Sequence, residues 1–343
     1  RAFRGAARGG QSLGPTAIGP GRKRPGGLEY AGAELLGLLA APDSAAWLQK
    51  MDEVRLLTAV FPELEASRRC AEVYYGKGGV LRHSLDAVAR MDFLLMELDA
   101  IYPGHAAAIR SALGARAGGL ERGQALLRLA VLLHDVAKPA TARRIGGRLR
   151  FFTHEARGAE MAAAALRGLR LPAEEIDMVA TVISQHLRPG NLAANRVISD
   201  RAVSRFFRDL GPHGPALLLL AWSDHASYLR PAALKAVLPR IYEDPTVLPR
   251  RRLSSERGKT LYHLQVISHL LDRSLRLPRP APAAAAGLLT GHEVMEALGI
   301  APGPKVGQSL SALAAAQAKG AVKNRAQALR FIHSLIDRSK KRR

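Results

Sequence analysis

Apolar residues recur along this chain at the three- and four-residue spacing of α-helices, and no long segment shows the alternation of a half-buried strand. Leu and Ala dominate the apolar positions, and clusters of β-branched residues are few. The pattern therefore predicts an all-α protein. Short helices are expected between residues 31 and 64, including one over 45–57, and further helices over 80–101, 122–136, 155–169, 203–210 and 215–228.

Proline and glycine mark the breaks in this pattern. Pro172 is expected in the first turn of a helix, where its missing N–H costs little. Residues 146–152 begin with two glycines and fit either a small hairpin or an extended loop. Residues 277–287 hold three prolines and an alanine run, which indicates a linker before a compact unit that ends near residue 336.

The charge of the chain points to a phosphate-rich partner. Its 343 residues carry a formal net charge of +22, which is typical of proteins that bind nucleic acids. An arginine-rich surface that only keeps the protein in solution is the alternative. Part of the charge lies in residues 1–27, which hold six basic and no acidic residues and are expected to have no fixed structure.

Cysteine content and hydropathy indicate a cytoplasmic protein. The single Cys70 excludes an intramolecular disulfide and fits a reducing compartment. The longest purely apolar run, Ala216 to Trp222, is too short to span a bilayer, and we recognise no signal peptide. Because residue 1 is arginine, we expect the chain to be a fragment or to have its true start upstream.

His134 and Asp135 are the most informative pair in the chain, because they end a helix whose preceding positions, 126–133, are nearly all apolar. A buried aspartate is rare unless it is paired or binds a metal. An imidazole beside a carboxylate supplies half of a metal site.

Four further residues stand where they could complete that site. His186 and Asp224 each follow apolar residues by three and four positions, which places them on the core-facing side of their helices. His154 comes just before a helix. His83 lies beside the main apolar stripe of its helix, and it faces inward if that helix is covered on two sides.

Each of these residues alone has a structural explanation, either a hydrogen-bonded core histidine or an aspartate that caps a helix or pairs with arginine. Together, four histidines and two aspartates at the inner ends of separate helices would leave several buried charges unless a cation gathers them. Mixed imidazole and carboxylate ligands fit Mn, Ni, Mg, Fe or Zn. The pattern leaves the number of metals and the oligomeric state open.

The order of these residues resembles that of the HD-domain superfamily of metal-dependent phosphohydrolases, with a histidine, a His-Asp pair and a later aspartate. The resemblance implies an HD-domain helical array. It implies His83, His134, Asp135 and Asp224 as core metal ligands. It makes His154 and His186 additional ligands or groups on the substrate side.

Three residues are candidates for catalysis on this resemblance: His154, His186 and Lys138. Either histidine would deliver a proton to the leaving group. Lys138 follows His134 by four residues and would neutralise a substrate phosphate, although Pro139 could bend it away. The family usually has glycine where this chain has Ala137, a small change that does not threaten the site.

Three segments outside the His-Asp pattern are similar to bacterial CCA-adding enzymes and poly(A) polymerases, the tRNA nucleotidyltransferase family. They are Trp47 to Leu64, Phe151 to Ala159 and Leu289 to Gly307. The resemblance implies five parts: a disordered basic tail at 1–27, a neck-like helical segment at 28–75, an HD domain at 76–275, a linker at 276–287 and a helical, RNA-facing tail at 288–343.

The nucleotidyltransferase head of that family carries a Gly-Gly turn and an Asp-x-Asp pair that holds two Mg²⁺ ions. This sequence has no Asp-x-Asp, and Gly9-Gly10 leads into neither motif. Nucleotide addition is therefore not expected from this chain alone.

Three hypotheses follow. The first is an HD-type, metal-dependent phosphodiesterase or phosphatase that acts on nucleotides or RNA ends. The second is the RNA-binding body and tail of a tRNA nucleotidyltransferase without its head, which grips tRNA. The third is a helical scaffold with a vestigial site, which the full ligand set disfavours.

Overall fold

The protein is described by a computed structural model that covers residues 31–115, 117–194, 198–245, 254–276, 288–301, 303–318, 321–322 and 324–340. The predicted basic tail at 1–27, and all but the first residue of the predicted linker at 276–287, lie outside these described residues. The chain divides into two compact units, Arg1–Leu277 and Pro278–Arg343.

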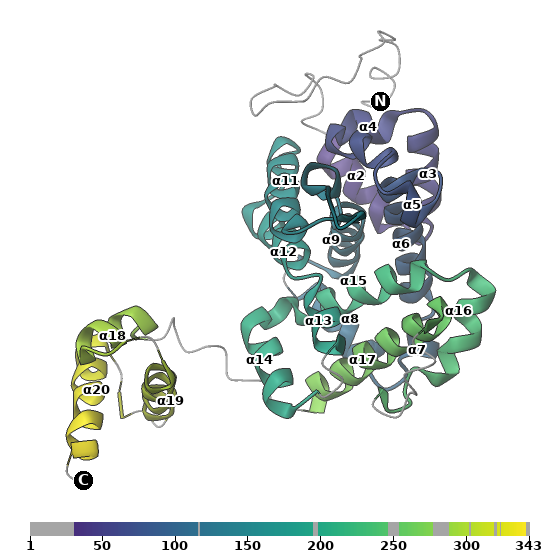
Figure 1. Cartoon of the computed structure of the whole chain (residues 1–343). Helices are drawn as coiled ribbons and strands as arrows, with labels where there is room; N and C mark the ends of the chain where they lie inside the picture. Colours follow the sequence, from purple (N-terminus) through teal and green to yellow (C-terminus); the bar gives the residue numbers. More distant parts are fainter. Residues whose placement is uncertain are drawn as a thin grey trace. The chain divides into compact units, whose positions relative to one another are not determined.

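The first unit is built almost entirely of helices, as the periodicity predicts. In order they are α2 (Ala31–Ala40), α3 (Ser44–Glu53), α4 (Leu56–Val60), η2 (Pro62–Arg68), α5 (Glu72–Tyr75), α6 (Gly79–Met96), α7 (Leu98–Ile101), α8 (Ala106–Gly114), α9 (Leu120–Leu133), α10 (Lys138–Thr141), α11 (His154–Gly168), α12 (Ala173–Ser184), α13 (Arg188–Ala194), α14 (Asp200–Leu210), η3 (Gly211–His213), α15 (Gly214–Ser227), α16 (Pro231–Val237), η4 (Leu238–Arg240) and α17 (Glu256–Arg276). The all-α prediction is confirmed (Figure 1).

One antiparallel hairpin supplies the strands of the described residues. It consists of β1 (Arg143–Ile145) and β2 (Arg148–Arg150), joined by Gly146 and Gly147, which both have positive φ. Glycine tolerates such φ values without steric cost, so the two-glycine turn explains why this segment forms a hairpin rather than an extended loop.

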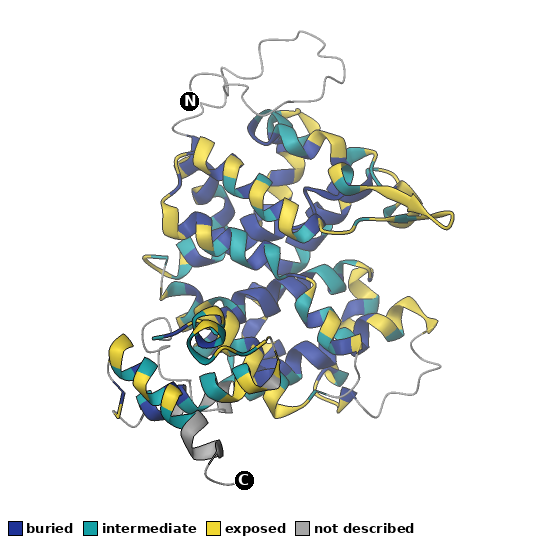
Figure 2. Cartoon of the chain, turned by 60° about the vertical axis from the view of Figure 1, so that its left-hand side comes forward, coloured by how far each residue is buried: buried dark blue, intermediate teal, exposed yellow. Residues whose placement is uncertain are grey.

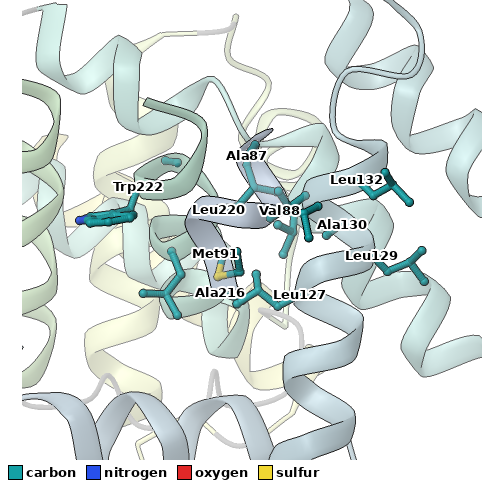
Figure 3. Packing of buried hydrophobic residues seen from close by; sticks show 14 of the residues in the cluster. Ala87, Val88, Met91, Leu127, Leu129, Ala130, Leu132, Ala216, Leu220 and Trp222 are labelled. Atoms are coloured by element: carbon teal, nitrogen blue, oxygen red, sulfur yellow. The ribbon is translucent and has the colours of Figure 1, made fainter. Parts of the chain in front are cut away.

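The helix α9 lies at the centre of the first unit and is buried around almost its whole circumference. It packs against α2, α6, α8, α12 and α15. Figure 3 shows the side chains of α6, α9 and α15 interlocking, with Met91, Leu127 and Leu220 among them. This enclosure explains the nearly continuous apolar run before the His-Asp pair, and it places the end of α9 inside the protein.

A buried ion pair joins the first helices to this centre. Asp92 of α6 binds Arg128 of α9 at 2.6 Å and accepts a hydrogen bond from the Ser44 hydroxyl at the start of α3 at 2.9 Å. Arg128 also donates to the carbonyl oxygen of Leu39 in α2 at 3.0 Å. The segment at residues 31–75 therefore shares one hydrophobic core with the helices that follow.

Several helix boundaries differ from the predictions. The helix expected over 45–57 is interrupted because Arg55 takes a left-handed conformation, with φ 59°. The helix expected over 80–101 is interrupted at Glu97, whose φ of −95° and ψ of 18° leave the helical range. Pro172 is the residue before α12 rather than within its first turn.

The second unit has a small core of its own. It contains α18 (Gly291–Leu298), α19 (Pro304–Ala318) and α20 (Arg325–Lys340). Thr290 and Glu293 form a reciprocal capping box at the start of α18. The buried side chains of this unit include Leu289, Val294 and Ile332. In neither unit do the described residues form a helix long and apolar enough to cross a bilayer.

Substitution of Gly123 tests the close approach of α9 to α8. A Cβ atom at Gly123 would lie 2.0 Å from the carbonyl oxygen of Leu113. We expect Gly123→Ala to lower the free energy of unfolding by about 1–3 kcal/mol, measured by urea denaturation. Gly37→Ala in α2 is the control: no atom lies within 4 Å of its Cβ position, so a change of about zero to +1 kcal/mol is expected. Equal changes in the free energy of unfolding of the two variants would contradict the close approach of α9 to α8.

Candidate metal centre

Six side chains from five helices meet at the inner end of α9. They are His83 of α6, His134 and Asp135 after the last residue of α9, His154 at the start of α11, His186 just beyond α12, and Asp224 of α15. The first five are buried, and the side chain of Asp224 is 19% exposed. The structure thus brings together all six residues that the sequence pattern selected, including His83, whose orientation the pattern left open.

Asp135 lies in the middle of the group, with one carboxylate oxygen on each side. Its Oδ2 lies 3.3 Å from Nε2 of His134 and 3.6 Å from Nε2 of His83. Its Oδ1 lies 3.4 Å from Nε2 of His154 and 3.7 Å from Nε2 of His186. Asp135 is therefore shared by two triplets whose ligand atoms lie within 4.8 Å of one another, His83–His134–Asp135 and Asp135–His154–His186.

Asp224 lies beside the two histidines of the first triplet. Its Oδ1 lies 3.1 Å from Nε2 of His83 and 3.9 Å from Nε2 of His134. Two carboxylates and two imidazoles therefore face a common point, and the second triplet adds two more imidazoles beside it.

All four imidazoles are held through Nδ1. The Nδ1 atoms of His134, His154 and His186 lie 2.8, 2.6 and 2.7 Å from the carbonyl oxygens three residues earlier in the chain. Nδ1 of His83 lies 3.1 Å from the hydroxyl of Ser227, which itself donates to the carbonyl oxygen of Asp224. A proton on Nδ1 of His83 and of His134 leaves their Nε2 lone pairs directed at the centre, as in histidines that bind metals. Nε2 of His154 and Nε2 of His186 lie 3.2 Å from each other.

The centre contains buried polar atoms that the described residues leave without a hydrogen-bond partner. Two are Nε2 of His83 and His134, and two are Oδ1 of Asp135 and Asp224. Buried atoms of this kind cost about 1–3 kcal/mol each when they are unsatisfied. All four are lone-pair donors. A cation beside His83, His134 and Asp224 would satisfy three of them, and Oδ1 of Asp135 faces the second triplet with His154 and His186. The nitrogen and oxygen donor set suits a first-row metal or Mg²⁺. The residues therefore fit a metal ion.

Comparison with known proteins agrees with this geometry. The family model described as "HD domain" matches residues 103–225, a segment that contains five of the six residues and begins after His83. The chain contains an HD domain.

The chain is also similar to two longer proteins. It is 29% identical over 301 residues to an A-adding tRNA nucleotidyltransferase of Deinococcus radiodurans. The aligned segment covers 87% of this chain and 56% of that protein. It is 30% identical over 307 residues to a CC-adding tRNA nucleotidyltransferase of Thermus thermophilus, with 87% and 55% covered. The chain is a distant homologue of these enzymes and spans about half the length of each.

Nearby charges and burial set the protonation of the carboxylates and of His186 in the candidate metal centre. Burial alone would raise the pKa of Asp135, but the charges of His134 and Lys138 hold that pKa well below its ordinary value. Burial would likewise raise the pKa of Asp224, and the imidazoles of His83 and His134 lower it. Burial, followed by the charge of His134, lowers the pKa of His186 to about 4. Both carboxylates are therefore ionised and His186 is neutral at pH 7.

Lys138 lies at the edge of the HD-domain centre, and Pro139 does not bend it away. Its ammonium forms a short ion pair with Asp135 and donates to the hydroxyl of Tyr75 at 2.6 Å. Asp135 raises the pKa of Lys138 against the opposing effect of burial, which keeps the ammonium charged.

Three residues that support the site were not among the predicted ones. The Tyr75 ring stacks on His83 with centroids 4.6 Å apart, and the Tyr228 ring lies 5.3 Å from His83. Ser227 holds Nδ1 of His83. For Ser227 and Tyr228 a clue existed, since they follow Asp224 by three and four residues on one helix; for Tyr75 there was none.

Metal addition and removal test the fit of the centre to a cation. We expect Mn²⁺ or Ni²⁺ to raise the melting temperature and a chelator to reverse the change, with a stabilisation of about 2.7 kcal/mol at a metal concentration of 100 Kd. His134→Ala should abolish the shift, measured by thermal denaturation and titration calorimetry. His292→Ala in the second unit is the control. Equal binding by both variants would place the metal elsewhere.

Ser227→Ala tests whether the Nδ1 contact orients His83. Loss of the hydroxyl acceptor should weaken metal binding by about 10–100-fold, because outer partners of ligand histidines contribute at this level. Ser223→Ala, one turn earlier in α15, removes a hydroxyl that binds only the carbonyl oxygen of Leu220 at 2.9 Å. An equal loss of affinity in both variants, measured by calorimetry, would argue against a specific role for Ser227.

Proposed function

We propose that this protein is an HD-type, metal-dependent phosphohydrolase, a phosphodiesterase or phosphatase that acts on nucleotide or RNA-end phosphates. The observation that carries the proposal is the set of buried, unpartnered donor atoms around Asp135. Two of these atoms belong to His134 and His83, whose rings are held in place through Nδ1. Such an arrangement is costly to maintain unless it binds a cation.

The ligands are divided between two groups in this proposal. His83, His134, Asp135 and Asp224 hold one divalent cation. Asp135, with His154 and His186, offers a second position on the other side of the carboxylate. A divalent cation bound there supplies charge neutralisation at the phosphate and lowers the pKa of a water nucleophile.

Three residues act on the substrate itself. The ammonium of Lys138 places a positive charge at the edge of the centre, where it offsets the charge of a phosphate oxygen. Where only the first position holds a cation, His154 or His186 is not a ligand and gives a proton to the leaving oxygen. The side chain of His154 is 8% exposed, against 2% for His186, so His154 is the better placed of the two to meet a substrate.

A second candidate function is the RNA-binding body of a tRNA nucleotidyltransferase. The similarity to A-adding and CC-adding enzymes over 87% of this chain supports it, and so does the net charge of +22. Under this hypothesis the chain binds tRNA, and the second unit contributes to that contact. The two functions are compatible with one another.

Hydrolysis of 2′,3′-cyclic AMP tests the first candidate. We expect turnover with Mn²⁺, Ni²⁺ or Mg²⁺ that falls by roughly a thousand-fold or more in His134→Ala/Asp135→Ala, because the substitutions remove two ligands of the cation. His292→Ala should keep full activity. Absence of metal-dependent turnover, or turnover equal in the double variant, would contradict the phosphohydrolase.

A truncation tests the second candidate. A chain that ends at Leu277 should lose affinity for tRNA, measured by filter binding, while its melting transition in the presence of metal is retained. Unchanged tRNA affinity would show that the second unit does not contact RNA.

A further inference from the structure

The exposed hairpin of β1 and β2 carries a dense group of positive charges. Arg143 and Arg144 lie on β1, and Arg148 and Arg150 lie on β2. All four side chains are exposed, and Figure 2 shows the hairpin projecting from the helices around it. No ion pair joins any of these arginines to another described residue of the chain.

The strand register places three of the arginines on one face. Arg143 pairs with Arg150, and Ile145 pairs with Arg148. Side chains of directly paired residues lie on the same face, and side chains alternate along each strand. Arg143, Arg148 and Arg150 therefore share a face with Ile145. Arg144 and Leu149 occupy the opposite face, and Leu149 is half-buried.

This arrangement costs stability in the free protein. Arg143 and Arg150 are directly opposite each other, and like charges in that position destabilise a strand pair. Neither packing nor ion pairing in the described residues offsets the repulsion. An anionic partner on this face would do so, and a row of phosphates has the required charge.

The hairpin is part of the surroundings of the metal centre. The chain enters it after Lys138 and leaves it at His154, two residues of the centre. The carbonyl oxygen of Phe151, directly after β2, accepts the Nδ1 contact of His154. The hydroxyl of Tyr74, next to Tyr75, donates to the carbonyl oxygen of Leu149 at 3.2 Å.

Exposed aromatic rings accompany the positive charges. Phe152 is 65% exposed just after β2, Tyr74 is 50% exposed beside the hairpin, and Tyr228 is 41% exposed near His83. Positive charge interleaved with exposed rings is typical of surfaces that bind single strands, because unpaired bases stack on aromatic faces while the backbone follows the charges.

We propose that the face formed by Arg143, Arg148 and Arg150 binds the sugar-phosphate backbone of a single-stranded RNA whose end enters the metal centre. The entry of the RNA end into the metal centre rests on the proposed function. Binding of the RNA backbone to the arginine face does not require hydrolysis. Strands of three residues span roughly 10 Å, so the face contacts a few nucleotides rather than a long tract.

Binding of a short, fluorescein-labelled single-stranded RNA to the full chain without added metal tests this inference. In Arg143→Gln/Arg148→Gln/Arg150→Gln, we expect affinity to fall by about ten-fold or more, and the slope of log K against log salt to shrink by about 2, since each lost phosphate contact removes about 0.7. Arg167→Gln/Arg201→Gln/Arg205→Gln removes the same charge from exposed positions on α11 and α14 and should change both quantities much less.

Two single variants distinguish the effect of the arginine's face on the hairpin from the effect of its charge alone. Arg148→Gln should weaken RNA binding more than Arg144→Gln, which removes the same charge from the opposite face of the same hairpin. Fluorescence anisotropy gives the affinities, and melting temperatures show that each variant is folded. Equal losses in the two single variants, or in the two triple variants, would overturn the inference. So would equal competition by an unlabelled RNA duplex, whose stacked bases cannot use the aromatic rings.

The outcomes distinguish this inference from the proposed function. A chain that binds RNA through the hairpin but hydrolyses no phosphate contradicts the phosphohydrolase alone. A triple variant with RNA affinity equal to that of the unaltered chain contradicts the hairpin site alone, whatever the hydrolytic activity is.

Discussion

The carboxylate of Asp135 is only 1% exposed, and the arrangement of the first unit depends on satisfying it. An unpaired ion at such depth costs several kcal/mol, about as much as the whole stability margin of many domains. His83 of α6, His154 of α11 and His186 just beyond α12 each bring an imidazole toward that one anion, and Lys138 adds a positive charge. The helix bundle is therefore organised around a charge as well as around an apolar core.

The sequence predicted which residues meet at the site better than it predicted the contacts that hold them there. Apolar spacing placed His186 and Asp224 on core-facing sides, and a buried His-Asp pair suggested a cation, because both arguments rest on local periodicity. His83 could not be oriented, since the helices that cover it come from distant parts of the chain. The stacking of Tyr75 on His83 and the break at Arg55 depend on tertiary contacts and backbone angles that periodicity does not encode.

The HD domain is not separable from the helices before it. The matched segment begins at residue 103, yet His83 lies on α6, and α6 is held to α3 and α9 through Asp92. A chain that began at residue 103 would lack His83, a candidate ligand, and would leave Arg128 without the carboxylate of Asp92. The first compact unit, which ends at Leu277, therefore extends well beyond both ends of the family match.

The anchoring of His134 and His186 to carbonyl oxygens three residues earlier has a consequence for the order of binding. These carbonyls belong to the last turns of α9 and α12, so the negative ends of two helix dipoles point at the same place as the two carboxylates. The residues of the centre by themselves therefore repel anions and attract cations. Under the proposed function, we therefore expect the cation to bind first and the phosphate second.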